Sequence, residues 1–502
     1  MSLLGIDVGT TGCKAVAFDA EGHILASAYK EYPLHSPQPG WAELDGNRVW
    51  DDVKSCIAKT ADATKSDPIT ALAVSCQGEA VSLLDEKGNV LHNALVSFDN
   101  RTEPYISQWE ERFGRQRIFE VTGQPLASVF TALKLQWIKE HKPEVLAKTK
   151  TILGFEDLVM FRLGMPPTTD YTLPARTMFF DVKKADWCDE FMEFAGVDRS
   201  MMPTPKPSGT LIGTIPNSIA GEIGLPHGVK VVTGGHDQPC QMLGAGVTKA
   251  NVAAYGIGTV ECIGPAFSEL LINNTMLKNN ICCYHHTCPQ LYIALVYNFT
   301  GGILFRWYRD ALSRDELRRA RETGRDVYDI LTEEAAQKPT NIIVLPHFTT
   351  TGVPHFDTRS KGVILGLTLG TTKAEITRGI LEGITYEMRM CVELLKEAGG
   401  VVNVLRATGG GAKSEYWLQI KADIMNIPIE VPSVSEAGCL GCAILAGSAT
   451  GVYSSVKEAA QQLARTGKTF EPQPENAKLY NERFEWYKEI YPRLKDIFHK
   501  MP

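Results

Sequence analysis

The chain has 502 residues, of which 44% are hydrophobic and 22% charged, and its formal net charge is −7. This composition is typical of a globular protein with two or three domains, and the acidic balance argues against a nucleic-acid partner. The chain begins with a strand pattern and not with a secretory leader.

Strand and turn signals alternate at the start of the chain. The first fifty residues predict three strands, separated by turns at residues 9–12 and 21–22. A helix follows, because apolar residues recur at helical spacing over 49–60, with Asp45 or Asn47 as its N-cap. Further strands are predicted over residues 69–77 and after a turn at 86–89.

A second series of the same kind begins near the middle of the chain. An apolar strand ends at residues 234–237, and a strand–turn–strand follows over 251–264. The motifs GIDVGT at Gly5 and AYGIGT at Ala254 share a branched apolar residue followed by Gly-Thr, which indicates two related halves that each open with a hairpin.

The rest of the second half is predicted to be mostly helical. The most apolar stretch, residues 291–308, holds polar residues and an arginine, so it predicts a buried strand leading into a helix and not a membrane span. Residues 380–395 form a helix stopped by Gly399 and Gly400, and residues 404–432 read as strand, glycine turn, helix and strand. Two helices with polar faces are expected after residue 454.

The twelve cysteines show no disulfide framework, so we expect reduced thiols and a cytoplasmic protein. One cluster lacks the paired spacing of structural zinc sites, so small buried thiols on a strand are favoured over a metal site. The cluster consists of Cys282, Cys283, His285, His286 and Cys288.

Three glycine turns follow apolar strands, at residues 9–12, 256–259 and 409–411. Such turns expose backbone N–H groups to phosphate and let a ligand approach the main chain closely. At the first turn, Thr10 and Thr11 add hydroxyl donors, Lys14 adds a point charge, and Asp7 suits Mg²⁺ held through water. The first hairpin therefore predicts a clamp for Mg²⁺ and phosphate; the alternative is an Asp7 that caps a turn beside strand-forming threonines.

Other nucleotide-binding motifs are incomplete or absent in the sequence. The segment TGKT at Thr466 ends like a Walker motif, but Gln462 stands where its first glycine is required. No strand precedes a GxGxxG helix with a later acid, which argues against a dinucleotide cofactor.

Asp237 follows an apolar strand and two glycines, where ligands meet open sheets. A carboxylate there can accept a proton from a substrate hydroxyl as it attacks phosphorus; the alternative is an aspartate that caps the next helix. Short amides and carboxylates near two other strand ends suit a polyhydroxyl ligand, although each alone suits a turn. These predicted substrate residues are Gln77, Glu79, Asp99, Asn100 and Arg101.

The sequence resembles the FGGY carbohydrate kinases almost from end to end; these include xylulokinases, fuculokinases, ribulokinases and glycerol kinases. The matching segments are GIDVGTTGCKAVAFD, PGWAELDGNRVW, SFDNRT, TDYTLPARTMFFD, GGHDQPCQMLGAGV, GIGTVE, GVILGLTLGTTKAEITRGILEGITYEM and TGGGAKSEYWLQIKADIMNIPIEVP. The resemblance implies an α/β fold of two actin-like (ribonuclease H-like) ATPase domains with the active site in a cleft. The expected domains are residues 1–243, with the sugar side and first phosphate hairpin, and 244–502, with the nucleotide side.

The resemblance also implies roles for individual residues. Asp7 becomes the acid on the Mg²⁺ side, and Asp237 becomes the catalytic base and a second metal-side carboxylate. Phosphate contacts fall to Thr10, Thr11 and Lys14, and to Gly258 and Thr259 in a second phosphate loop. The residues expected to line the adenosine are Gly409, Gly410, Gly411 and Ala412.

The sequence departs from the family pattern at several positions, and the first two departures bear on the identity of the substrate and not on phosphoryl transfer. Gly78 stands where glycerol kinases have an arginine, although Glu79 matches their glutamate; xylulokinases have Met-His after the glutamine matched by Gln77. Phe98 replaces a usual tryptophan, Gly379 replaces a usual alanine or serine, and GGHDQP is closer to fuculokinase-like sequences.

The expected function is ATP- and Mg²⁺-dependent phosphorylation of a small sugar, a ketose such as xylulose, on a terminal hydroxyl. Three alternatives remain open: a kinase of a polyol such as glycerol or erythritol, a regulatory or chaperone-like ATP-binding module of the same fold, and a metal-dependent hydrolase using Asp7 and Asp237. No nucleic-acid or membrane partner is expected, and a homodimer is left open.

Overall fold

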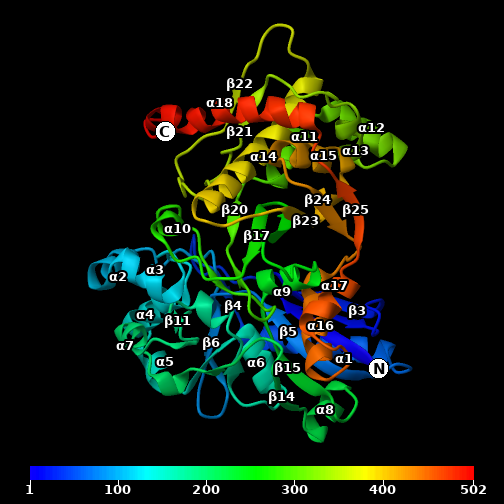
Figure 1. The fold of residues 1–502 in the computed structure, drawn as a ribbon. Helices are drawn as coiled ribbons and strands as arrows, with labels where there is room; N and C mark the ends of the chain where they lie inside the picture. The colour runs from blue at the N-terminus through cyan, green and yellow to red at the C-terminus, as the bar shows by residue number, and fades with distance from the viewer. Residues whose placement is uncertain (502) are drawn as a thin grey trace.

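The computed structural model describes residues 1–501 and shows two lobes, each built on a mixed sheet (Figure 1). In the six-stranded sheet of the first lobe, the order is β14-β15-β5-β1-β2-β3. Strands β1, β2 and β3 pair antiparallel, whereas β5 runs parallel to β1 and β15 parallel to β5. The strands are β1 (Ser2–Val8), β2 (Gly12–Phe18), β3 (Ile24–Glu31), β5 (Ile69–Cys76), β14 (Leu211–Thr214) and β15 (Lys230–His236).

The eight-stranded sheet of the second lobe repeats this connectivity. Strands β16 and β17 form an antiparallel hairpin, β16 runs parallel to β23, and β23 runs parallel to β24. Both halves therefore open with a hairpin, as the matching glycine motifs predict. The strands are β16 (Val252–Ile257), β17 (Glu261–Phe267), β18 (Tyr284–His285), β19 (Tyr292–Ile293), β20 (Val296–Asn298), β23 (Val404–Thr408), β24 (Ile429–Pro432) and β25 (Thr466–Phe470).

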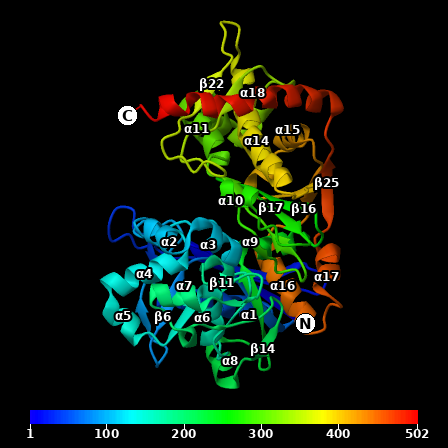
Figure 2. The same ribbon diagram turned by 60° about the vertical axis from the view of Figure 1, so that its left-hand side comes forward.

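Helices cover the first sheet on both faces. The carboxylate of Asp45 accepts a hydrogen bond from the backbone N–H of Asn47 at 2.9 Å, so Asp45 is the N-cap of α1. Helix α16 lies late in the chain, after most of the second lobe, but it packs on β1, β5 and α9. Both ribbon views place it with the first lobe (Figures 1 and 2). The helices of this lobe are α1 (Gly46–Ala63), α6 (Phe155–Arg162), α8 (Asn217–Ile223), α9 (Asp237–Gly244), α16 (Ala437–Ala449) and α17 (Val456–Leu463).

Glycine allows α16 to approach the first sheet closely. A Cβ on Gly5 would lie 1.9 Å from the carbonyl oxygen of Cys439, and one on Gly244 would lie 1.8 Å from that of Ala437. The small-residue segment AGCLGCAILAG is this helix. The division at residue 243 stays a prediction, to which the structure adds that residues 437–463 return to the first lobe.

A group of helices and short strands extends the first lobe around a separate core that contains the fully buried Trp109. The helices are α2 (Tyr105–Phe113), α3 (Arg115–Thr122), α4 (Thr131–His141), α5 (Pro143–Lys148) and α7 (Asp189–Ala195). The strands are β4 (Glu43–Leu44), β6 (Val81–Leu84), β7 (Val90–His92), β8 (Ala94–Leu95), β9 (Thr151–Gly154), β10 (Thr168–Thr169), β11 (Phe180–Asp181), β12 (Asp186–Trp187) and β13 (Thr204–Pro205).

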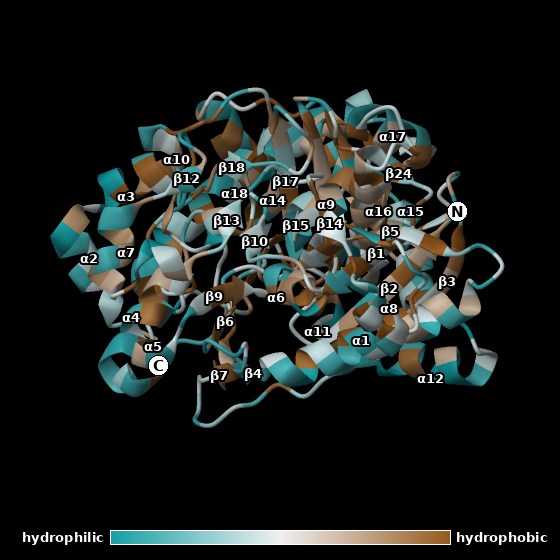
Figure 3. Ribbon diagram, turned by 90° about the horizontal axis from the view of Figure 1, so that it is seen from below, coloured by the Kyte–Doolittle hydropathy of each residue, from teal (hydrophilic) through white to brown (hydrophobic). Residues whose placement is uncertain are grey.

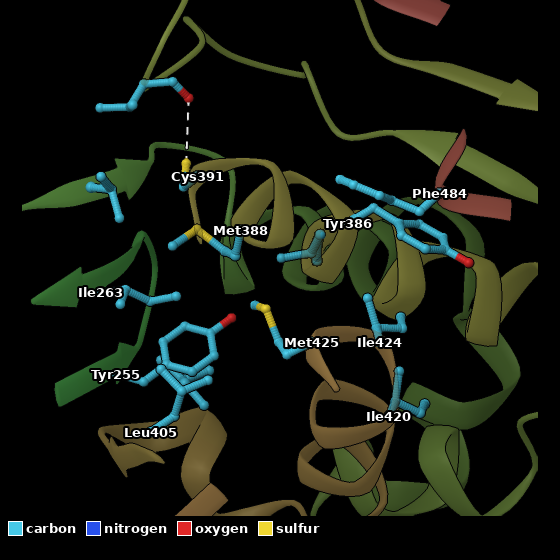
Figure 4. Close-up of a cluster of buried hydrophobic side chains, with 14 of the residues drawn as sticks. Tyr255, Ile263, Tyr386, Met388, Cys391, Leu405, Ile420, Ile424, Met425 and Phe484 are labelled. Atoms are coloured by element: carbon cyan, nitrogen blue, oxygen red, sulfur yellow. Dashed lines mark hydrogen bonds between the residues drawn. The ribbon is translucent and has the colours of Figure 1, made fainter. Parts of the chain in front are cut away.

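The core of the second lobe lies between its sheet and two long helices. In the close-up of Figure 4, Met388 of α14 lies near Ile263 and Met425, whereas the thiol of Cys391 donates to the carbonyl of Val353 at 3.5 Å. The remaining elements are α10 (Asn274–Lys278), α11 (Gly302–Leu312), α12 (Arg314–Thr323), α13 (Val327–Glu333), β21 (Ile343–Leu345), β22 (Val363–Leu365), α14 (Lys373–Glu397), α15 (Glu415–Met425) and α18 (Pro474–Phe498). Hydrophobic segments gather toward the middle of the molecule, and hydrophilic ones occupy its loops and peripheral helices (Figure 3).

Two elements differ from the sequence prediction. Helix α14 begins at Lys373, because Thr372 and Glu375 form a capping box ahead of the apolar pattern. The segment after residue 454 contains strand β25 between its two helices, and β25 pairs antiparallel with β24. Residues 291–308 form strands β19 and β20 and the start of α11, as predicted. Across the described residues, none of the helices combines the length and apolarity needed to cross a bilayer.

Candidate active site

The first glycine turn joins β1 to β2 and is braced by Gln77. The N–H of Gly9 donates to the carbonyl of Gly12 at 2.9 Å, and the hydroxyl of Thr10 donates to Oε1 of Gln77 at 3.0 Å. The amide nitrogen of Gln77 donates to the carbonyl of Gly9 at 3.3 Å. Gln77, predicted as a substrate residue, therefore supports the turn, and Thr11 lies exposed at its tip.

Asp7 and Lys14 face each other across this hairpin. The carboxylate of Asp7 accepts a hydrogen bond from Ser75 at 2.9 Å, and burial raises its pKa. The ammonium of Lys14 lies 2.9 and 3.0 Å from the two carboxylate oxygens of Glu436, just before α16. Lys14, expected to contact phosphate, is thus paired with a carboxylate.

Asp237 is the first residue of α9 and directly follows β15. It does not cap the helix, because His236 occupies the N-cap position, so the alternative of a capping aspartate is wrong. Its side chain is 37% exposed, but its Oδ1 is buried without a hydrogen bond. Burial, and then the negative charges of Asp7 and Glu79, raise the pKa of Asp237 to about 7.

His236 lies between Asp237 and a tyrosine of the second lobe. Its Nδ1 is 2.9 Å from the hydroxyl oxygen of Tyr284, and its Nε2 is 3.2 Å from Oδ1 of Asp237. Burial, and then the charge of Arg176, lower the pKa of His236 to about 3, so the imidazole is neutral. The sequence prediction missed both residues, although His236 stands inside the quoted segment GGHDQP.

Glu79 forms a buried ion pair with Arg176, which the sequence prediction also missed. The Nε of Arg176 donates to Glu79 Oε1 at 2.6 Å, and the hydroxyl of Ser97 donates to Oε2 at 2.6 Å. Burial raises the pKa of Glu79, but the guanidinium of Arg176, together with Lys134 and the hydrogen bond from Ser97, lowers it overall. A Cβ on Gly78 would lie 3.0 Å from Cγ of Arg176 and 3.1 Å from the ring of His236, so glycine leaves room for both.

The other predicted substrate residues brace a loop. Arg101 donates to Asp99 at 2.7 and 2.8 Å and to Glu43 at 2.8 Å, and its guanidinium lies 3.7 Å from the ring centroid of Trp41. Asp99 also accepts from the backbone N–H of Ala42 at 2.7 Å. These contacts favour a structural role for Asp99 and Arg101, and they leave Asn100 exposed beside Gly40.

The second and third glycine turns meet at one cavity. Its volume is about 530 Å³, and it is lined by Gly258, Thr259, Gly302, Gly410 and Gly411 and by the aromatic rings of Phe305, Tyr328 and Trp417. Gly409 has φ +90°, and a Cβ there would lie 2.7 Å from the carbonyl oxygen of Ile257. Ala412 lines a neighbouring depression with Leu418 and Phe470. Glycine N–H groups beside aromatic walls suit phosphates and a planar base.

The cysteine and histidine cluster spreads its side chains among separate partners. The thiol of Cys283 accepts from the N–H of Leu271 at 3.3 Å, and Nε2 of His286 is 3.0 Å from the carbonyl of Val247. All twelve cysteines are free thiols. Across residues 1–501, the structure groups no three histidine, cysteine or acidic side chains in a way that could hold a metal ion.

The chain matches known carbohydrate kinases along its length. Residues 2–244 match the N-terminal domain, and residues 257–450 the C-terminal domain, of the FGGY family of carbohydrate kinases. A xylulose kinase of Staphylococcus epidermidis is 27% identical over 499 residues, covering 99% of this chain and 97% of that protein. A glycerol kinase of Saccharolobus islandicus is 30% identical over 483 residues, covering 91% and 89%.

Solved structures agree with this assignment. The structure of a gluconate kinase from Lactobacillus acidophilus superimposes with a TM-score of 0.90 at 26% identity, covering 99% of both chains. The predicted two-domain, actin-like α/β fold is confirmed. This protein is therefore an enzyme that belongs to the FGGY family of carbohydrate kinases.

Proposed function

We propose that this kinase transfers the γ-phosphoryl group of ATP, with Mg²⁺, to a terminal hydroxyl of a small neutral sugar, a ketose such as xylulose. The observation that carries the proposal is the carboxylate of Asp237. It is half-exposed, has a pKa of about 7, and lies near Asp7 of the first glycine hairpin and the buried pair of Glu79 and Arg176. A carboxylate with a pKa near neutral pH is suited to general base catalysis at that pH.

We assign one substrate to each lobe. We assign the aromatic and glycine-lined cavity of the second lobe to ATP, with its phosphates directed toward the first hairpin. The sugar then lies on the side of Glu79 and Arg176. In the transfer, the sugar hydroxyl loses its proton to Asp237, its oxygen bonds to the γ-phosphorus, and the bond from that phosphorus to the bridging oxygen breaks to release ADP.

Two carboxylates suit a hydrated divalent cation here. Asp7 and Asp237 are close enough for the charge of Asp7 to raise the pKa of Asp237. Mg²⁺ is commonly bound by one or two carboxylates and substrate phosphates, with water completing its coordination, and it offsets the charge of the phosphates. Asp7 would hold it through water.

The charge of the sugar side favours a neutral substrate. Asp7, Glu79 and Asp237 are acidic, whereas the guanidinium of Arg176 is already paired with Glu79 and the ammonium of Lys14 with Glu436. An aldonate such as gluconate would bring a carboxylate into this negative region, where Lys134 is buried and donates to the carbonyl of Glu79 at 3.1 Å. A polyol remains the second candidate, because Glu79 is retained and a glycerol kinase is 30% identical.

A substrate panel tests this proposal. Xylulose, ribulose, fuculose, glycerol, erythritol and gluconate would each be incubated with ATP and Mg²⁺, and both ADP and the phosphorylated product would be measured. We expect a ketose to give the highest kcat/KM and gluconate to give no product. Release of inorganic phosphate at the same rate with and without sugar would contradict the proposal and favour a hydrolase or a regulatory ATPase.

A further inference from the structure

The segment of residues 282–288, singled out above for its cysteines and histidines, is fixed around the helix that carries Asp237. We call it the strap. The backbone N–H of Cys283 donates to the carbonyl of Gly123 at 2.8 Å, and the hydroxyl of Thr287 donates to the carbonyl of Pro239 in α9 at 3.0 Å. Nε2 of His286 lies 3.0 Å from the carbonyl of Val247, just after α9. The strap belongs to the second sheet through β18, but it contacts the first lobe at Gly123 and Pro239.

Tyr284, at the centre of the strap, reaches the residue before Asp237. Its side chain is fully buried, and its hydroxyl oxygen is 2.9 Å from Nδ1 of His236, which is 5% exposed. The backbone N–H of His236 donates to the hydroxyl of Thr172 at 2.7 Å. His236 is therefore held through both its imidazole ring and its backbone N–H.

The other ring nitrogen faces Asp237. Nε2 of His236 is 3.2 Å from Oδ1 of Asp237, and this oxygen is buried without a hydrogen bond among the described residues. Such a separation is at the long end of the range for an N–H···O bond, and catalytic hydrogen bonds often shorten when substrates bind. A buried carboxylate oxygen without a donor would be costly, so the imidazole is the natural donor to it.

The contacts favour one position for the ring proton of His236. A neutral imidazole has one N–H and one lone pair. If Tyr284 donates its O–H to Nδ1, the proton must sit on Nε2, the nitrogen that lies 3.2 Å from Oδ1 of Asp237. The opposite tautomer would place a lone pair against the ionised carboxylate, which is unfavourable.

We infer that Tyr284 and His236 are positioning residues for Asp237: the tyrosine hydroxyl holds the imidazole in the Nε2–H tautomer, and the imidazole holds Oδ1 so that Oδ2 is free to accept the proton of the sugar hydroxyl. This inference rests on the proposed role of Asp237 as the base. Because Tyr284 lies on the second sheet and Asp237 on the first lobe, the orientation of the base depends on how the two lobes meet.

Steady-state kinetics of four variants test the inference. Tyr284→Phe removes only the hydroxyl that fixes the tautomer of His236. We expect kcat to fall about 10- to 100-fold, the effect of losing the bond from His236 to the charged carboxylate, while KM for ATP and for sugar stays within about twofold. Tyr292→Phe, on the paired strand β19, is the matched control and should retain kcat. His236→Leu should lose at least as much as Tyr284→Phe, whereas His236→Gln, whose amide N–H can replace Nε2–H, should recover much of the loss.

The outcomes separate this inference from the proposed function. If Asp237→Asn is inactive while Tyr284→Phe keeps wild-type kcat, the base is supported and the positioning role is overturned. The inference is also overturned if Tyr284→Phe loses kcat and melting temperature together and His236→Gln is no better than His236→Leu, because that pattern indicates packing alone. If Asp237→Asn retains turnover, the proposed base itself is wrong.

Discussion

Lys14 and Glu436 tie the first glycine hairpin to the start of α16, with the ammonium nitrogen 2.9 Å from one carboxylate oxygen and 3.0 Å from the other. Burial lowers the pKa of Lys14, but the hydrogen bond to Glu436 and the negative charges of Glu436 and Asp7 together raise the pKa overall. If Lys14 contacts phosphate, its ammonium must either stay paired with Glu436 at the same time or break that ion pair.

Removing the carboxylate should therefore strengthen ATP binding. We expect Glu436→Gln to lower the Kd for ATP about two- to fivefold, because half-exposed ion pairs are worth roughly 0.2–1 kcal/mol and the variant frees the ammonium for phosphate. Isothermal titration calorimetry would measure the Kd. Lys14→Met should weaken binding. Lys30→Met, on the neighbouring strand β3, breaks the pair with Asp52 of α1 and should leave binding unchanged. Unchanged affinity in both Glu436→Gln and Lys14→Met would remove Lys14 from the phosphate site.

The third glycine turn gives a test of the nucleotide cavity. Gly409→Ala places a Cβ at φ +90°, 2.7 Å from the carbonyl oxygen of Ile257, so the turn must shift. We expect a loss of about 1–3 kcal/mol in stability, together with a raised KM for ATP and an unchanged KM for sugar. Gly410→Ala is the control for stability, because a Cβ there meets no atom within 4 Å, and its melting temperature should match the wild type. A raised KM for sugar alone would contradict the assignment of this cavity to ATP.

The pair of Arg176 and Glu79 gives a test of the sugar side. The two side chains are only 14% and 5% exposed, so Arg176→Met would leave a buried carboxylate without its cation, at a cost of about 3–5 kcal/mol. The double variant Arg176→Met, Glu79→Gln should lose less stability than Arg176→Met alone, which denaturant unfolding would measure. We expect both to raise the KM for sugar and to leave the KM for ATP unchanged. Additive losses would show that the two side chains are not energetically coupled.

The raised pKa of Asp237 predicts the pH dependence of the reaction. Because a base must be ionised, kcat/KM should fall about tenfold per pH unit below about pH 7 and level off above it. A profile that stays flat down to pH 5 would contradict the burial and charge described around Asp237.

The same shift predicts a stability effect with a definite sign. The pKa of Asp237 is about 7 in the folded state and 3.8 in the unfolded chain, so the folded state binds this proton more tightly. Ionisation of Asp237 therefore destabilises the fold. This loss in the free energy of unfolding is complete above about pH 7, becomes smaller as the pH falls, and is absent below the pKa of the unfolded chain. Asp237→Asn should therefore raise the melting temperature relative to wild type at pH 8 more than at pH 4. An equal difference at both pH values would contradict the shift.

The parts of the site that the sequence could predict are local. The glycine hairpins, the Asp45 cap and the place of Asp237 after β15 depend on residues close together in the chain. The partners of Asp237 and Glu79 are not local: Tyr284 is 48 residues from His236, and Arg176 is 97 residues from Glu79. No periodicity joins residues at such separations, so Arg176 and Tyr284 were missed.

The direction of a side chain near a turn is equally hard to predict. Gln77 and Asp99 follow or precede turns, as substrate ligands often do, but packing directs Gln77 to the carbonyl of Gly9 and Asp99 to Arg101. Strand β25 was missed because its five residues are mostly exposed and carry little apolar pattern; its pairing with β24 defines it.

The central claim is that Asp237 takes the proton of the sugar hydroxyl, and single-turnover kinetics of Asp237→Asn test it most directly. The amide keeps the size of the side chain but cannot accept the proton, so we predict a fall in the rate of phosphoryl transfer of at least about a hundredfold with an unchanged Kd for ATP. Asp62→Asn, on the exposed face of α1, is the control and should keep the wild-type rate. Transfer by Asp237→Asn within a fewfold of wild type, under the same conditions, would contradict the claim.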